Sequence, residues 1–402
     1  MFRSKLVAAV IGIALLAPAY GDEASVGVTA TEIKVGATFP FSGAASGLAN
    51  SGRGLMAYVQ SLNDRGGVNG RKINLITLDD AYSPPKAVEH TRRLVENDEV
   101  AFIFGTLGTP SNSAIVKYLN GKKIPHLSIV TGATKFTNAS DYPYTTTGLP
   151  SYDTEGKIYA RYINKTLPPG AKIGILYQND DMGKDFVKSF KETLKDEFDK
   201  RVLASPYELS FPTVDSQIYL LKNFGAEAVF VAGTPKFAAQ AIRKAHEINW
   251  KPLIVLNFIS SSVSATLVPA GVENAVGVIS GSFYKDPSDP KWNDDQSVVN
   301  YRAYFAKYLP GADIGDTTYL TGTQQGQILE QLLKQCGNDL SRENINRQAH
   351  NLKNIVLPTF LDGVRIDTTP TNVQAITQLK LRRWNGKAWE EFGEVLSGAD
   401  VE

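Results

Sequence analysis

Residues 101–116 read AFIFGTLGTPSNSAIV and contain the clearest structural pattern of the sequence. It opens with four continuously apolar residues, 101–104, a pattern typical of a strand buried on both faces of a parallel sheet. A loop rich in Gly and Thr follows, and residues 113–119 are predicted to form a helix. A strand, a glycine-containing loop and a helix in this order make one unit of a parallel α/β sheet.

The same alternation extends in both directions and restarts once. Strands are predicted at residues 33–39, 73–78 and 126–129, with helices at 55–62 and 84–97. A second set begins at residue 154. Its predicted helices are 154–163, 186–198, 214–222 and 236–248, and its predicted strands are 172–177, 202–207, 228–232 and 253–256. Two such sets predict an α/β protein with two doubly wound parallel-sheet lobes.

The last third of the sequence lacks this regular alternation. It contains a predicted strand at 276–280, predicted helices at 298–308, 321–335 and 342–352, and a hairpin of 376–383 and 387–391 around Asn385-Gly386. These elements lack partners of their own, so we expect the chain to recross between lobes near 147–150, 277–281 and 355–359. The predicted domains are lobe 1 (22–148 plus 281–355) and lobe 2 (149–280 plus 356–402).

The N-terminus is typical of an export signal. Two basic residues precede an apolar run at 6–16, and Ala17-Pro18-Ala19 supplies the small residues that a signal peptidase requires. The run is shorter than the roughly 20 residues that a membrane-spanning helix needs. We therefore predict a signal peptide at 1–21, cleaved near Ala19–Gly21, and a periplasmic location.

Composition excludes several functions. Lys and Arg number 42 against 41 Asp and Glu, which leaves no positive excess for nucleic acid. Cys336 stands alone, so no intrachain disulfide is expected, and the four His residues are scattered without metal-ligand spacing. Residues 52–57 match a dinucleotide-binding fingerprint, but a long loop separates them from the preceding strand. We expect no catalytic residue, metal or cofactor; the competing class is an enzyme or a receptor module in a two-lobed fold.

Several motifs, taken in order, carry a family resemblance. They are Phe41-Ser42-Gly43, Leu62-Asn63-Asp64, Gly66-Gly67-Val68-Asn69-Gly70, Asp79-Asp80, Gly105-Thr106-Leu107-Gly108-Thr109, Thr131-Gly132-Ala133-Thr134 and residues 175–183. Together they resemble the branched-chain amino acid binding proteins of bacterial ABC transporters, across essentially the whole mature chain. The resemblance implies a two-lobed clamp with three crossovers that binds a small solute in its cleft and delivers it to membrane permease subunits. We expect a monomer that is not embedded in the membrane.

Ligands of parallel α/β lobes lie beyond the carboxyl ends of the strands. Two loops of the first lobe meet this condition, and the helix N-termini there favour a carboxylate. The resemblance assigns the carboxylate to Thr109 and Thr134 and a backbone contact to Gly132, and we include the adjacent Gly108 and Ala133 in the predicted site. The alternative is that these residues only cap helices and form turns.

The second lobe departs from the family pattern. Met182 and Thr234 stand where relatives that bind leucine, isoleucine or valine carry Tyr, and no acid stands near Asn257-Phe258, where the family has the Glu that pairs with the ligand ammonium. Tyr152 and Phe258 are candidates to stack on a hydrophobic or aromatic ligand.

Two hypotheses therefore stay open. In the first, the ligand is a branched-chain or other hydrophobic amino acid, and Asp153, Asp180 or Asp181 replaces the missing Glu. In the second, the ligand is an aromatic or other organic carboxylate that lacks an ammonium group.

Overall fold

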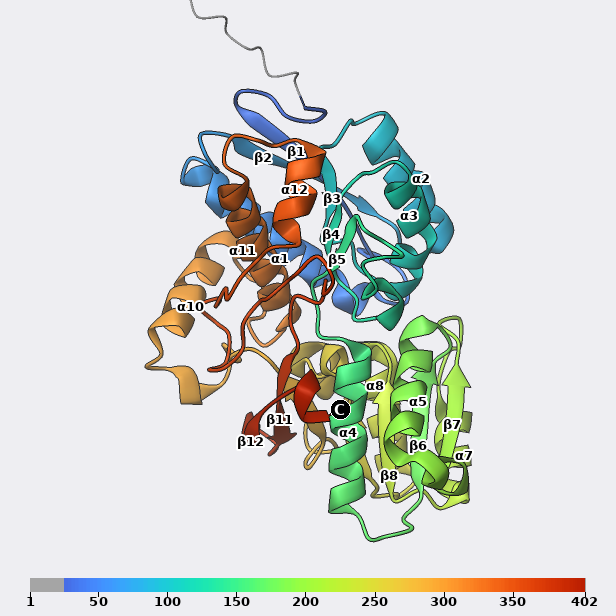
Figure 1. Ribbon diagram of the computed structural model, residues 1–402. Helices are drawn as coiled ribbons and strands as arrows, with labels where there is room; N and C mark the ends of the chain where they lie inside the picture. Colours follow the sequence, from blue (N-terminus) through green and yellow to red (C-terminus); the bar gives the residue numbers. More distant parts are fainter. Residues whose placement is uncertain (1–24, 402) are drawn as a thin grey trace, which may run out of the picture.

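The computed structural model describes residues 25–401 and contains two α/β lobes joined by three connecting segments (Figure 1). The predicted signal peptide at 1–21 lies outside the described residues. The first sheet is parallel, in the order β2-β1-β3-β4-β5. Its strands are β1 (Glu32–Phe39), β2 (Lys72–Asp79), β3 (Phe102–Phe104), β4 (His126–Ile129) and β5 (Thr145–Thr147).

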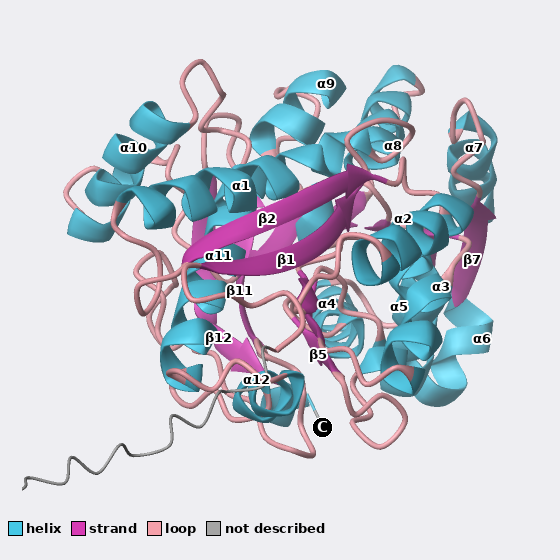
Figure 2. Ribbon diagram, turned by 90° about the horizontal axis from the view of Figure 1, so that it is seen from above, coloured by secondary structure: helices cyan, strands magenta, loops and turns pink. Residues whose placement is uncertain are grey.

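Helices cover both faces of this sheet, as the continuously apolar β3 requires (Figure 2). Phe102 and Phe104 share a buried cluster with residues of α1 (Ala49–Asp64) and α11 (Thr318–Cys336). Ile103 belongs to another cluster, with α2 (Pro84–Glu96) and α3 (Thr109–Gly121). The later helices α10 (Gln296–Tyr308) and α12 (Arg342–Ala349) lie beside the first lobe (Figure 1).

The second sheet has the order β12-β11-β10-β9-β8-β6-β7, and only β11 runs antiparallel to the other strands. Its strands are β6 (Ile173–Gln178), β7 (Val202–Tyr207), β8 (Ala228–Ala232), β9 (Leu253–Leu256), β10 (Ile279–Ser282), β11 (Gln378–Trp384) and β12 (Trp389–Ser397). Its helices are α4 (Tyr152–Thr166), α5 (Asp181–Leu194), α6 (Phe198–Arg201), α7 (Asp215–Phe224), α8 (Pro235–Glu247) and α9 (Val268–Ala270). Side chains of α4 and α5 pack in one buried cluster, and those of α7 and α8 in another.

The three connecting segments lie side by side between the lobes. The first joins β5 to α4, the second leaves β10, and the third enters β11. Isolated bridges pair Tyr284 with Phe360 and Thr147 with Gln374, so each segment is tied to a neighbour. The predicted fold class is thereby confirmed: two doubly wound lobes joined by three crossovers.

Local differences from the sequence-based elements have simple causes. The strand predicted at 276–280 is β10 at Ile279–Ser282, because Gly277 takes a φ of 91° and turns the chain just before it. The short edge strand β5 was not predicted, since three threonines form no apolar run. Helix α4 begins at Tyr152 and not at residue 154, with Ser151 accepting a hydrogen bond from the Asp153 amide at 3.2 Å.

Candidate functional site

A cavity of about 540 Å³, its open mouth included, lies between the lobes at the carboxyl ends of the strands. Among its lining residues there is no Lys, Arg, His, Asp or Glu. The apolar lining residues are Leu48, Leu107, Gly108, Val130, Leu149, Phe258 and Ile259. The hydroxyl-bearing ones are Ser51, Tyr82, Thr109, Tyr152, Ser262, Tyr284, Thr317, Thr318 and Thr321.

The first-lobe wall is the junction of β3 and α3. Gly108 takes a φ of 109°, and a Cβ there would lie 2.6 Å from the Tyr82 ring, so glycine is required. Helix α3 starts at Thr109, and no side chain caps it. The Thr109 hydroxyl lies 2.7 Å from the Thr131 hydroxyl. An uncapped helix N-terminus next to a threonine hydroxyl is suited to an anionic group.

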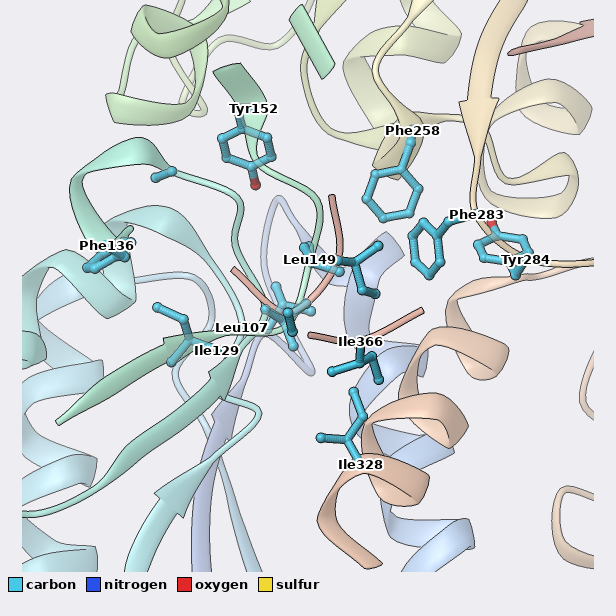
Figure 3. Close-up of a cluster of buried hydrophobic side chains, with 14 of the residues drawn as sticks. Leu107, Ile129, Phe136, Leu149, Tyr152, Phe258, Phe283, Tyr284, Ile328 and Ile366 are labelled. Atoms are coloured by element: carbon cyan, nitrogen blue, oxygen red, sulfur yellow. The ribbon is translucent and has the colours of Figure 1, made fainter. Parts of the chain in front are cut away.

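Tyr152 reaches this wall from the start of α4. In Figure 3 its side chain descends from the second lobe with the hydroxyl toward the first lobe. A Cβ on Gly132 would lie 2.9 Å from the Tyr152 ring, so the ring packs directly on that glycine. Burial raises the pKa of the Tyr152 phenol to about 12, while hydrogen bonds with Thr131, the Gly132 backbone and Thr109 act in the opposite direction. Tyr152 is therefore a neutral phenol that lies among the residues predicted to bind the carboxylate of the ligand.

Tyr82 is a wall residue that the sequence did not reveal. Ala81 and Tyr82 have φ values of 49° and 60°, a strained conformation for residues other than glycine. The two preceding acids hold it: Asp79 accepts from the Ala81 amide at 2.9 Å and Asp80 from the Tyr82 amide at 2.8 Å. The adjacent aspartates Asp79 and Asp80 predict a turn at this point of the sequence, and the structure shows that they stabilise it.

The second-lobe wall is aromatic. Phe258 follows β9 and packs edge-on against Phe283, with ring centroids 5.2 Å apart (Figure 3). The Phe258 amide donates to Glu155 Oε1 at 2.5 Å, and the Tyr159 hydroxyl donates to the same oxygen at 2.8 Å. A buried acid from α4 thus lies behind Phe258. The family resemblance places an acid near Asn257-Phe258 in the sequence, where this chain has none.

Another wall of the cavity is made by the first turns of α1 and α11. The helices approach closely through glycines: a Cβ on Gly322 would lie 1.9 Å from the Ser51 carbonyl oxygen, and one on Gly54 would lie 2.2 Å from the Tyr319 oxygen. This approach places Ser51 beside Thr318 and Thr321. Gly54, part of the apparent dinucleotide fingerprint, therefore serves helix packing.

Comparison with known proteins identifies the family. A family model described as periplasmic binding protein matches residues 32–388. The chain belongs to this family. Since the match spans both lobes and most of the crossovers, membership covers the entire two-lobed unit, and the family resemblance found in the sequence is confirmed.

Curated periplasmic binding proteins match part of the chain. Leu/Ile/Val-binding protein homolog 7 of Brucella suis biovar 1 (strain 1330) is 26% identical over 234 residues, 56% of this chain and 58% of that protein. Homolog 8 of the same strain is 25% identical over 260 residues, 62% of either chain. The chain thus spans less than two thirds of the length of these curated relatives.

Solved periplasmic binding proteins share the fold over nearly the full chain. A branched chain amino acid ABC transporter structure from Thermus thermophilus with bound valine has a TM-score of 0.82 at 15% identity, covering 92% of this chain and 98% of that one. A fatty acid ABC transporter substrate-binding protein from Thermomonospora curvata has a TM-score of 0.79 at 19% identity, covering 94% and 96%. Identities this low establish the fold alone.

The structure brings only some of the predicted site residues together. Gly108, Thr109, Tyr152 and Phe258 line the cavity. The others are not among its lining residues: Gly132, Ala133, Thr134, Met182 and Thr234. Their role in binding stays a prediction.

Each of these other residues has a different position in the fold. Gly132 packs under the Tyr152 ring, and Ala133 is fully buried next to it. Met182 is buried in the first turn of α5, and Thr234 is the residue preceding α8. The Thr134 hydroxyl and amide both donate to Asp185, at 2.6 and 2.7 Å.

The three acids considered as partners for an ammonium group are engaged elsewhere. Asp153 pairs with Lys157 at 2.8 Å, and Asp181 pairs with Lys135 at 3.0 Å. Asp180 caps α5 by accepting from the Gly183 amide at 3.2 Å, and burial raises the pKa of its carboxyl to about 6. None of the three lines the cavity.

A fourth acid, Asp316, lies behind the α1–α11 wall. Its carboxylate accepts from the Thr318 amide at 3.1 Å, the Thr318 hydroxyl at 2.7 Å, the Ser262 hydroxyl at 3.2 Å and the Asn50 amide group at 2.7 Å. A carboxylate offers about four acceptor positions. Three of these donors bind Oδ1 and one binds Oδ2, so Asp316 is engaged by four protein donors.

Within residues 25–401, no His, Cys, Asp and Glu side chains are grouped to hold a metal ion, and no helix is long and apolar enough to cross a membrane.

Hydrogen bonds close the lobes against each other beside the cavity. Asp185 of α5 accepts both bonds from Thr134, and Asp181 accepts from Ser113 at 3.2 Å in addition to its pair with Lys135.

Replacing Asp185 by Ala removes two hydrogen bonds to a carboxylate. This should make closure of the lobes less favourable and weaken ligand binding by about 1.5–3 kcal/mol. Calorimetry and solution scattering of the variant test this. Asp199→Ala, at an exposed position, is the control, and equal affinity in both variants would contradict it.

Proposed function

We propose that this periplasmic binding protein is the solute-binding component of an ABC transporter. It acts in the periplasm, binds a hydrophobic organic acid that lacks an ammonium group, and delivers it to membrane permease subunits. Support for the transport role comes from membership of the family and from the similarity to Leu/Ile/Val-binding homologues. The proposal assigns a catalytic role to no residue.

One observation carries the choice of ligand: the cavity lining has hydroxyls and apolar groups but no charged side chain. A carboxylate finds donors there, at the uncapped start of α3, at the Thr109 hydroxyl and at the Tyr152 phenol. No acid lines the cavity, so an ammonium group would have no counter-charge in direct contact. Breaking a buried ion pair by removing one partner costs about 3–5 kcal/mol, so an amino acid would bind with a comparable penalty.

The rival hypothesis is a hydrophobic amino acid held by Asp180. One observation favours it: the charge of Asp180 raises the pKa of both Tyr82 and Tyr152, after the larger effect of burial, so Asp180 lies close to two lining residues. Substituting Asn for Asp180 separates the hypotheses. An amino acid ligand would lose affinity for the variant, whereas a simple acid would bind it at least as well.

Matched ligand pairs test the proposal directly. Calorimetric titration should compare leucine with 4-methylpentanoate, and phenylalanine with 3-phenylpropanoate, since each acid is its partner without the amino group. We expect the acid of at least one pair to bind tenfold or more tightly than its amino acid, a difference of about 1.4 kcal/mol. Tighter binding of leucine or phenylalanine would reject the ligand class while leaving the transport role intact.

Thr109 provides the residue-level test. Changing it to Ala removes a hydrogen bond to the ligand carboxylate and should weaken binding of the preferred acid by about 1.5–3 kcal/mol. Thr193→Ala, on the outer helix α5 and away from the cavity, is the matched control. Equal affinities of the two variants would remove Thr109 from the site.

The ligand also explains closure. An acid bound to the first-lobe wall is covered by Tyr152 and Phe258 only when the lobes are closed, and it therefore stabilises the closed form. A closed pair of lobes has one fixed spacing, which a permease can distinguish from the open form.

A further inference from the structure

Ser51 is a cavity-lining residue whose hydroxyl is left without a partner among the described residues. The residue is 3% exposed and lines the cavity, and its Oγ has no hydrogen-bond partner within the described part of the chain. Buried hydroxyls almost always have a partner, in the protein or in a bound molecule. The other hydroxyls of this wall are occupied: Thr318 donates to Asp316 at 2.7 Å, and Thr321 donates to the Thr317 carbonyl at 3.3 Å.

The position of Ser51 is fixed by the fold. The close contact of Gly322 with the Ser51 carbonyl holds the first turn of α1 against α11. Ser51 therefore lines the cavity from a closely packed pair of helices, on a different wall from the uncapped start of α3.

The surroundings define which chemical group fits. No charged side chain lines the cavity, and Asp316 stands behind this wall, where four protein donors bind its carboxylate. A second carboxylate on the ligand would be repelled by Asp316, and a cationic group would have to compete with the four protein donors that Asp316 already binds. An uncharged hydrogen-bonding group, such as a hydroxyl, is both tolerated and satisfied.

We propose that Ser51 forms a second polar subsite, so that the ligand is an acid carrying an uncharged hydroxyl on its hydrophobic body. The carboxylate binds at the start of α3, and the distal hydroxyl exchanges a hydrogen bond with Ser51. This inference rests on the proposed function, because it takes the ligand to be an acid in this cavity, and it adds the requirement for a second functional group.

The test uses acids in which a hydroxyl replaces a methyl group of similar size. The pairs are 4-hydroxybenzoate with 4-methylbenzoate, and 6-hydroxyhexanoate with heptanoate. Affinities are measured by calorimetry for the full chain, for Ser51→Ala and for Ser61→Ala. Ser61 is a matched control because it is a buried serine on the same helix that does not line the cavity.

For the chain with Ser51 present, the hydroxylated member of at least one pair should bind about three- to tenfold more tightly than its partner. Ser51→Ala should abolish or reverse this ratio, and Ser61→Ala should keep it. The free Ser51→Ala protein should melt no lower than the parent, since the hydroxyl has no bond to lose there. A hydroxyl with a merely structural role would instead lower the melting temperature and leave the ratio unchanged.

The alternative outcomes are separable. If acids bind but show no preference for the hydroxyl, or keep it in Ser51→Ala, the subsite is rejected and the proposed function stands. If none of the four acids nor the deaminated amino acids binds, the proposed function fails and the subsite fails with it.

Discussion

Replacing Arg382 by Met is expected to lower the free energy of unfolding by about 3–5 kcal/mol, because it leaves a buried carboxylate without its counter-charge. Arg382 lies on β11, and its Nη1 is 3.7 Å from Asp286 Oδ2, with side chains 2% and 6% exposed. Asp286 lies in the segment that leaves β10, so the pair ties this connecting segment to strand β11 of the second sheet. Urea denaturation of the ligand-free protein measures the change.

Two further contacts hold the guanidinium in place. Its Nη2 donates to the Ser261 hydroxyl at 2.7 Å, and its Cζ lies 4.6 Å from the centroid of the Trp389 ring. Adding Asp286→Asn should restore part of the lost stability, because the second substitution removes the uncompensated charge.

Arg383→Met is the matched control for this prediction. It changes the neighbouring residue on the same strand, which is exposed, so its effect should stay within about 0.5 kcal/mol. Equal destabilisation by the two single substitutions would show that the buried pair contributes nothing specific.

The alternating strands and helices of the two lobes could be predicted because each buried strand has a recognisable local sequence pattern. Runs such as Phe102–Phe104 and Ala228–Ala232 are apolar at every position, which parallel strands covered on both faces require. The helices between them carry apolar residues at helical spacing. The loops that follow strands were also predictable, and they contain Gly108 and Thr109, which line the cavity.

The remaining walls depend on contacts between distant parts of the chain. Ser51 meets Thr318 and Thr321 only because α1 packs on α11, and nothing in either segment alone indicates that pairing. The direction of a side chain beyond a strand end is equally undetermined by sequence: Thr134 follows β4 as expected, yet both its bonds go to Asp185.

The missing family acid illustrates the same limit. Sequence comparison located its position at Asn257-Phe258 and found no acid there. In space, the Glu155 carboxyl comes from α4 and binds the Phe258 amide, 103 positions away in sequence. A local pattern at either residue does not predict this contact.

Glu155 should make the stability of the protein depend on pH. The residue is 0% exposed, no basic group pairs with it, and its Oε2 has no partner among the described residues. Burial raises the pKa of this carboxyl to about 7, from an ordinary value of 4.5, although the Phe258 amide and the Tyr159 hydroxyl act in the opposite direction. The folded protein therefore favours the protonated acid.

The sign follows from the raised pKa. The contribution of Glu155 to stability is fully present below the unfolded-state pKa and is lost as the pH rises through about 7, since folding then keeps buried a carboxyl that would ionise in water. A pKa raised from 4.5 to about 7 corresponds to about 3 kcal/mol. Above pH 8, the free energy of unfolding should be lower by about that amount than at pH 4 from this group alone.

Glu155→Gln isolates the effect, because the amide keeps the shape and one acceptor oxygen but cannot ionise. Urea denaturation from pH 5 to pH 9 should show the variant gaining on the parent as the pH rises, until it is the more stable protein above pH 8. The exposed Glu89→Gln on α2 is the control and should follow the parent. Parallel pH curves for Glu155→Gln and the parent would mean that this carboxyl ionises freely in the folded protein, and the prediction would be wrong.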